Sequence, residues 1–100
     1  MSAASRERFT GAILAGHKEA AVEVPFDPAR RWNRGSVQLR PGRRGHRVTG
    51  VIAGVAFVGV VVPRSRRFWL VVGQDQLARA GGAVGDTVAV EIEPAESAGV

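Results

Sequence analysis

The sequence predicts an all-β fold, a small barrel or sandwich of about seven short strands with two helices of one turn each. Three observations lead to this prediction. Apolar and polar residues alternate over short segments, as in strands that bury one face. Residues typical of turns interrupt these segments every few positions. The chain has 100 residues, 45% of them hydrophobic, which is enough for one small core.

The first half of the chain is predicted to contain three strands and one short helix. Asp27 can accept backbone N–H groups as an N-cap, and Pro28 suits the first helical position, where an N–H would have no partner. We expect residues 41–46 to form a polar turn, because Pro and Gly begin it and nothing in it is apolar. The other expected elements are strands over 8–15, 20–24 and 36–40, a turn at 16–18 and a helix over 29–32.

The second half is predicted to contain four strands and a second short helix. The uncharged run 48–63 is rich in β-branched residues, which indicates two buried strands joined by a turn at Ala53–Gly54. Asp75 is the expected N-cap of the helix, and Gly81 its C-terminal residue in the left-handed region. The expected strands are 47–52, 55–62, 67–72 and 87–93, with the helix over 76–80.

A single domain over residues 8–93 accounts for all of these elements, and we expect frayed ends at 1–7 and 94–100. A weak internal repeat favours a barrel over a sandwich. Residues 24–39 and 72–90 each contain a strand, a short helix near an Asp, a turn and a second strand. Two interleaved halves of this kind would close a barrel without free edges, each helix covering one end. The alternative is that short capped turns between strands resemble one another.

Positive charge is concentrated in the middle of the chain, although the net charge is only +5. Between Asp27 and Asp75 there are ten arginines and no acidic residue, while the rest has four basic and nine acidic residues. The middle therefore carries +10 and the flanks −5, which favours an anion-attracting face. The alternative is an ordinary solvated surface over which the acidic flanks fold back. The candidate anion- or nucleic-acid-binding residues are Arg40, Arg43, Arg44, Arg47, Arg64, Arg66 and Arg67.

The two tryptophans, Trp32 and Trp69, are the candidate contacts for a partner. An exposed Trp beside Arg is typical of binding interfaces. The alternative, in a chain this small, is that a Trp covers the core.

No motif for catalysis, a metal or a cofactor is present. The chain has no Cys, hence no thiolate nucleophile and no Cys-based metal site. His17 and His46 lie beside glycines and cations, with no acid nearby in the sequence to orient a general base. The glycines at 81–85 lack the Lys–Ser/Thr ending of a phosphate-binding loop. We therefore expect a protein that is not an enzyme and binds no cofactor.

The sequence shows no sign of export or of membrane insertion. Residues 1–8 are polar with mixed charge and lack the apolar segment of a secretory signal. The uncharged run 48–63 contains three glycines and is shorter than the roughly 20 residues of a membrane-spanning helix. We expect a cytoplasmic monomer or homodimer without membrane contact.

Four motifs, distributed over most of the chain, together resemble the sequence pattern of one known family. They are Phe9–Thr10, Val22–Asp27, the hairpin Val48–Gly54 with Phe57, and Gln76–Gly81 followed by Val84–Ile92. Over residues 8–93 the chain resembles the domain of unknown function 1905, a bacterial family of small β-barrels that occur alone or fused to the YdeI/OmpD-associated domain. The resemblance implies a double-split β-barrel capped at both ends by helical turns. It implies no catalytic residues, because the family has no established activity.

Two functions are compatible with these observations. The first is a binding or accessory module for a protein or small-molecule partner. The alternative is a basic nucleic-acid-binding barrel similar to AbrB/MazE-like proteins, whose fold the family shares in outline. Residues 40–47 would form its Arg-rich loop, since Arg suits phosphates and guanine edges, although residues 32–46 look longer and more basic than the family's usual loop. The two functions differ in whether the arginine side chains converge on one face.

Overall fold

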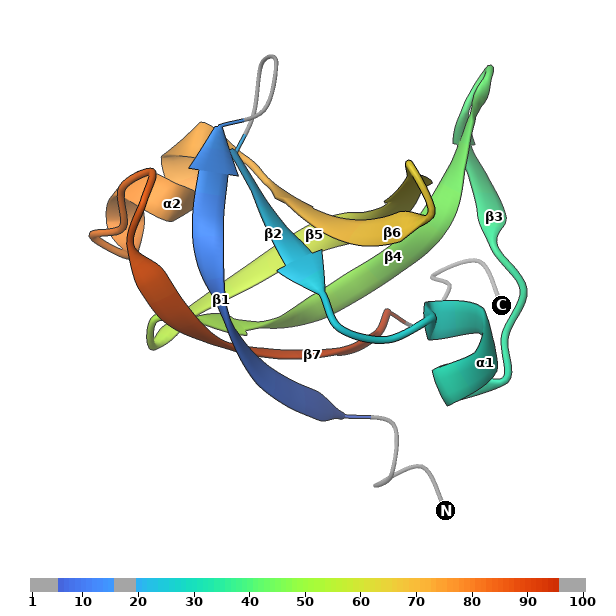
Figure 1. Ribbon diagram of the computed structural model, residues 1–100, viewed down its shortest axis with the longest axis horizontal. Helices are drawn as coiled ribbons and strands as arrows, with labels where there is room; N and C mark the ends of the chain where they lie inside the picture. The colour runs from blue at the N-terminus through green and yellow to red at the C-terminus, as the bar shows by residue number, and fades with distance from the viewer. Residues whose placement is uncertain (1–5, 16–19, 96–100) are drawn as a thin grey trace.

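The fold is a closed antiparallel barrel, seen in a computed structural model that describes residues 6–15 and 20–95 (Figure 1). In this part of the chain the strands are β1 (Glu7–Ala15), β2 (Ala20–Val24), β3 (Val37–Arg40), β4 (Arg43–Ile52), β5 (Val55–Arg64), β6 (Arg67–Val72) and β7 (Thr87–Pro94). The helices are α1 (Pro28–Trp32) and α2 (Gln74–Arg79). Six strands follow one another in the order β4-β5-β6-β2-β1-β7, and β7 pairs back onto β4. The predicted all-β barrel is confirmed.

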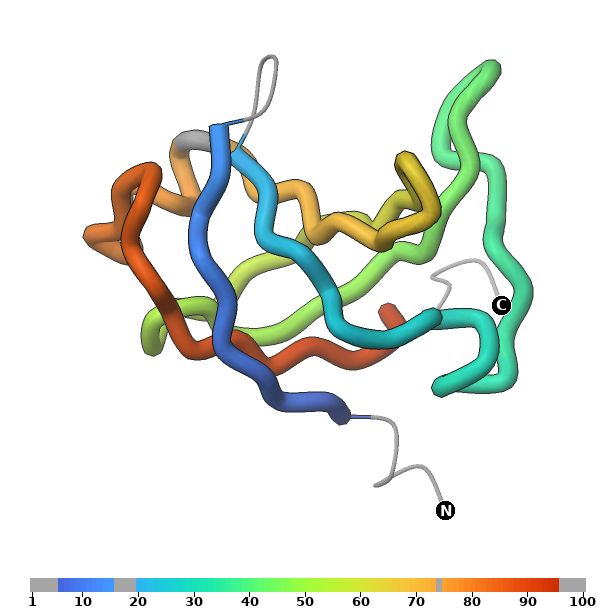
Figure 2. The backbone as a smooth tube through the Cα atoms, in the orientation of Figure 1, coloured from blue at the N-terminus to red at the C-terminus, as the bar shows by residue number. Residues whose placement is uncertain are grey.

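The strand β3 lies outside the barrel and pairs with β4 alone among the described strands. Figure 2 shows the β3–β4 hairpin, in green, projecting away from the barrel wall. The internal repeat is therefore only partly realised. Its first strands, β2 and β6, pair with each other, but β7 closes the barrel whereas β3 stays outside. The finer description as a double-split barrel stays a prediction.

The core consists of alternate residues that face the barrel interior. Ile13, Ile52, Leu70 and Ile92 are fully buried, each with 0% of its surface exposed. The alternation predicted for residues 67–72 and 87–93 is confirmed by the burial of alternate residues in β6 and β7. Trp32 from α1 and Leu77 from α2 join this core, and Pro28 of α1 is buried as well. Because α1 and α2 lie at opposite ends of the molecule (Figure 1), the predicted helical caps are confirmed.

The N-cap of α1 is the predicted residue, whereas that of α2 is not. Asp27 is the N-cap of α1, and its carboxylate accepts the Ala29 N–H at 3.0 Å, as expected. Asp75 is not the N-cap of α2. That position belongs to Gly73, whose extended backbone lets the helix start at 74, so Asp75 lies in the first turn. Gly81 ends the helix as predicted, with φ at +71° and its N–H donated to the Ala78 carbonyl.

The predicted turn over residues 41–46 is wrong beyond its first two residues. Pro41 and Gly42 do form the turn, but β4 begins at Arg43, so His46 lies in a strand. Pairing with β3, for instance of Val37 with Gly45, provides hydrogen-bond partners for the backbone N–H and C=O groups there. The segment therefore forms a strand although its side chains are polar. The strands also extend one residue past the predicted domain, to Glu7 and Pro94, which pair with neighbouring strands. The turn at 16–18 and most of the predicted frayed ends lie outside the described residues.

The side chain of Gln76 connects α2 to β5 through two hydrogen bonds to the backbone of Val58. Val58 lies where β5 runs beyond the end of its pairing with β6, which starts at Val60. The side-chain amide of Gln76 accepts the Val58 N–H at 2.9 Å and donates to the Val58 carbonyl at 3.0 Å. Gln76 therefore makes the two bonds that a neighbouring strand would otherwise make.

We expect Gln76→Ala to lower the free energy of unfolding by about 1–2 kcal/mol, since two hydrogen bonds to the backbone are lost. Urea denaturation followed by circular dichroism measures this change. Gln76→Glu probes the same contact, because it keeps an acceptor for the Val58 N–H but places a carboxylate oxygen against the Val58 carbonyl oxygen, and it should also be less stable than the wild type. An Ala variant as stable as the wild type would contradict this role of Gln76.

Candidate functional site

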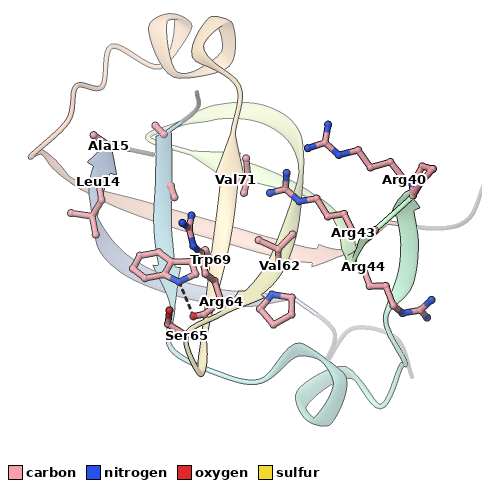
Figure 3. Close-up of a pocket in the computed structure, with 15 residues that line it drawn as sticks. Leu14, Ala15, Arg40, Arg43, Arg44, Val62, Arg64, Ser65, Trp69 and Val71 are labelled. Carbon is pink, nitrogen blue, oxygen red and sulfur yellow. Dashed lines mark hydrogen bonds between the residues drawn. The ribbon is translucent and has the colours of Figure 1, made fainter. Parts of the chain in front are cut away.

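A groove of about 1070 Å³ lies on the outside of the barrel (Figure 3). Outward-facing residues of β1, β2, β5 and β6 contribute to it, together with the β3–β4 hairpin. The strand register explains its apolar floor. Leu14 is opposite Ala21, and Ala21 is opposite Val71, while Trp69 is opposite Val62 in the next row. Apolar side chains thus occupy an outer face where a barrel surrounded by water normally carries polar ones.

The β3–β4 hairpin stands beside this floor because two glycines allow it to. Gly42 adopts φ at +78° in the turn after Pro41, a backbone conformation that suits glycine. Gly45 lies where β4 comes close to β5, and a Cβ there would be 2.5 Å from the Val61 carbonyl oxygen. The hairpin can therefore lie close against the barrel while it carries its arginines along the groove.

Four of the seven arginines singled out from the sequence line the groove. They are Arg40, Arg43, Arg44 and Arg64. In Figure 3, Arg40 and Arg43 extend from the hairpin toward β6, and Arg64 lies beside Trp69. Arg44 points the other way, and its guanidinium donates to the Ser36 carbonyl at 2.8 Å and to the Ser36 hydroxyl at 3.3 Å.

The other three arginines do not line the groove. Arg67 lies on the outer face of β6, where its guanidinium is 3.3 Å from the Glu23 carboxylate. Arg66 lies in the turn between β5 and β6, and Arg47 is exposed on β4 opposite Val60. Whether the seven candidate arginines converge was left open by the sequence, and the structure divides them between the groove and the rest of the surface.

Three of the groove arginines have no acidic partner in the described part of the chain. Among the residues that the structure describes, Arg40, Arg43 and Arg64 have no carboxylate within salt-bridge distance. Arg6 shows the contrast, because hydrogen bonds to Glu91 and then Glu93 raise its pKa above the usual value. The acidic flanks do fold back on part of the basic block, but no described carboxylate forms a salt bridge with an arginine that lines the groove.

The two tryptophans have different positions. Trp69 is half-buried and lines the groove, and its indole N–H donates to the Arg64 carbonyl at 3.4 Å. Trp32 has only 8% of its surface exposed and packs edge-to-face against Phe26 and His46, with ring centroids 5.5 and 6.4 Å away. Trp32 therefore covers the core, which is the alternative that the sequence left open for a tryptophan in a chain this small.

Apart from Trp69, the apolar residues of the groove floor were not among the site residues predicted from the sequence, although a signal was present. Residues 67–72 are apolar on both faces of the strand, because Trp69 and Val71 lie opposite the buried Leu70 and Val72. A strand that is apolar on both faces indicates a second covered surface or a binding surface. Val62 is likewise an apolar residue on the outward face of β5, and only 7% of its surface is exposed.

No catalytic or metal-binding arrangement was found in the described part of the chain. There, no cluster of three or more His, Cys, Asp or Glu side chains could hold a metal ion. His46 contacts Trp32, and its Nε2 lies 3.0 Å from the Arg34 carbonyl, so that Nε2 donates in the tautomer that forms this bond. Within the same described residues, no helix has the length and apolar character needed to cross a membrane.

The turn after Arg64 is strained. Ser65 and Arg66 have φ values of +55° and +66°, the pattern of a type I′ turn, which Asn and Gly normally form. We expect Arg66→Gly to raise the free energy of unfolding by about 1 kcal/mol, because a side chain in this region is disfavoured by that amount. Urea denaturation measures the change. Arg66→Ala is the control, since it removes the same charge but keeps a Cβ, and equal stability of the two variants would contradict the strain.

One family model matches residues 9–92 of the chain, and it is described as a domain of unknown function, DUF1905. The chain belongs to this family. The match extends from β1 to β7 and confirms the resemblance stated from the sequence motifs. No curated protein matches the chain. Because the DUF1905 family carries no assigned function, the chemistry of the groove is the basis for a proposal.

Proposed function

We propose that this DUF1905 domain is a non-enzymatic binding module whose groove holds a small amphipathic anion, either free or presented by a protein partner. One observation carries the proposal. Arginines without acidic partners stand directly beside an apolar floor that is open to solvent. The apolar part of such a ligand would cover Leu14 and Val71, and its anionic group would meet Arg43 and Arg64.

Both halves of the groove favour the same kind of ligand. Covering apolar surface stabilises a complex by about 25 cal/mol for each Å² removed from water. The planar guanidinium of Arg can donate two parallel hydrogen bonds to a carboxylate or a phosphate. A neutral apolar ligand would form no ion pair with the arginines, and a simple inorganic anion would not cover the apolar floor.

Fluorescence titration with anilinonaphthalene sulfonate tests this proposal, because the probe joins apolar rings to one anionic group. We expect saturable binding to the folded protein. Leu14→Asp should weaken binding by about tenfold or more, since it places a carboxylate on the groove floor. Val84→Asp is the matched control, because Val84 is an exposed apolar residue like Leu14, 58% against 43%, but lies outside the groove. Unchanged binding by Leu14→Asp, or an equal loss in the control, would contradict the proposal.

A nucleic-acid-binding function, as in AbrB/MazE-like barrels, is the alternative. The shared position of Arg40, Arg43 and Arg64 beside one groove favours it. Fluorescence anisotropy with a labelled duplex at about 50 and about 200 mM salt distinguishes the two, because non-specific phosphate contacts weaken steeply with salt. Duplex binding tighter than about 10⁻⁶ M at the higher salt would favour this alternative. Loss of duplex binding at the higher salt, with the sulfonate probe still bound, would favour the small anion.

A further inference from the structure

Trp69 provides an aromatic surface within the groove, next to the positive charge. In cross-strand register the residue lies between Glu23 of β2 and Val62 of β5. The bond from its indole N–H to the Arg64 carbonyl, at 3.4 Å, holds the ring against the β5–β6 hairpin. Figure 3 shows the indole on the groove floor beside Arg64. An aromatic ring held in this way can stack against a planar ligand.

The arginines of this groove come from two separate hairpins. Arg64 comes from the end of β5, and Arg40 and Arg43 come from the two ends of the Pro41–Gly42 turn. Glu23 is the acidic residue beside Trp69 in the register, and it is already paired with Arg67 at 3.3 Å. Among the described residues, the unpaired charges that a ligand on Trp69 would meet at the groove are therefore guanidinium groups. Phosphate oxygens suit these donors well.

We propose that the ligand is a nucleotide unit, with its base stacked on Trp69 and its phosphate bound by Arg43 and Arg64. This inference rests on the proposed function and names the ligand class of the same groove. Stacking on an aromatic side chain tolerates any base, because every base has a π-face. The unit can come from a free nucleotide or from a single strand. It cannot come from an intact duplex, whose bases are stacked inside and would leave Trp69 and the apolar row Leu14–Ala21–Val71 uncovered.

Tryptophan fluorescence tests the inference because one tryptophan lines the groove and the other is buried in the core. The chain has two, and Trp32 is buried in the core, so quenching by an added base reports on Trp69. We expect adenosine 5′-monophosphate to quench part of the emission saturably. Adenosine and inorganic phosphate, each lacking half of the ligand, should bind at least about tenfold more weakly.

Two variants connect this signal to the groove. Trp69→Phe should abolish the quenching while equilibrium dialysis still detects weaker binding, because a smaller aromatic ring remains. Arg43→Ala should weaken binding of the monophosphate about tenfold or more and leave binding of adenosine unchanged. Circular dichroism checks that both variants are folded. Quenching that persists in Trp69→Phe, or an equal effect of Arg43→Ala on adenosine and its monophosphate, would overturn the assignment.

A short single-stranded oligoadenylate distinguishes the two sources of the nucleotide. Binding about tenfold or more tighter than the monophosphate identifies a single strand, and equal binding identifies a free nucleotide. Both results support the nucleotide unit. If neither ligand binds while the sulfonate probe still does, the nucleotide inference is wrong and the proposed function stands. If the sulfonate probe also fails to bind, the groove is not a site for amphipathic anions, and the proposed function fails as well.

Discussion

Gly50→Ala is expected to prevent the barrel from closing. A Cβ at position 50 would lie 1.8 Å from the Glu91 carbonyl oxygen and 2.9 Å from the Cα of Ile92. Gly50 pairs with Ile92 in the β4–β7 ladder, which closes the barrel. Because the obstacle is backbone and not a flexible side chain, the two strands must separate. We expect a loss of at least about 3 kcal/mol in the free energy of unfolding, a large part of the stability of a domain this small.

Urea denaturation followed by circular dichroism measures this effect. Gly35→Ala is the matched control, since a Cβ at position 35 meets nothing within 4 Å and the residue has no positive φ. The control should be as stable as the wild type. A Gly50→Ala protein with the same unfolding midpoint as the control would show that β4 and β7 do not approach each other as described.

The double substitution of Arg43 and Arg64 by Ala is expected to weaken binding of the sulfonate probe about a hundredfold. A hydrogen bond to a charged group contributes about 1.5–3 kcal/mol, so each arginine accounts for roughly tenfold or more. The fold should be unaffected, because Arg64 is exposed and Arg43 half-buried, and neither side chain has an acidic partner among the described residues. The bond from Trp69 also survives, since the backbone carbonyl of Arg64 accepts it.

The double substitution of Arg30 and Arg79 by Ala provides the control for net charge. Both residues are exposed, both lie in the short helices, and neither lines the groove. This variant loses the same two charges and should bind the probe nearly as tightly as the wild type. Equal losses in the two double variants would mean that overall charge, not the groove, attracts the anion.

Most of the fold could be predicted from local patterns. Alternation in residues 67–72 and 87–93 predicted strands and their buried faces, because a half-buried strand repeats every two residues. Ala53–Gly54 predicted the turn within the apolar run, where both residues adopt positive φ. The extension of β4 into residues 43–46 could not be predicted in this way, since it depends on pairing with β3 and not on the polar residues themselves.

The site was harder to predict because it depends on long-range register. Local sequence gives no reason to separate Arg43 from Arg47, yet the first lines the groove and the second does not. Likewise Trp32 directly follows an arginine and Trp69 lies two residues after one, and only the closed barrel shows that α1 turns Trp32 into the core. The groove joins residues from β1, β2, β5 and β6, which become neighbours only once the barrel has formed.

Titration of the protein with anilinonaphthalene sulfonate, followed by ¹H–¹⁵N correlation spectra, is the most direct test that the groove is the binding site. The chain has two indole N–H groups, one in the groove and one in the core. We expect the Trp69 indole signal and the backbone signals of Val62 and Val71 to shift with saturation. The Trp32 indole signal should stay in place. A saturable shift elsewhere that leaves the Trp69 signal unchanged would contradict the account.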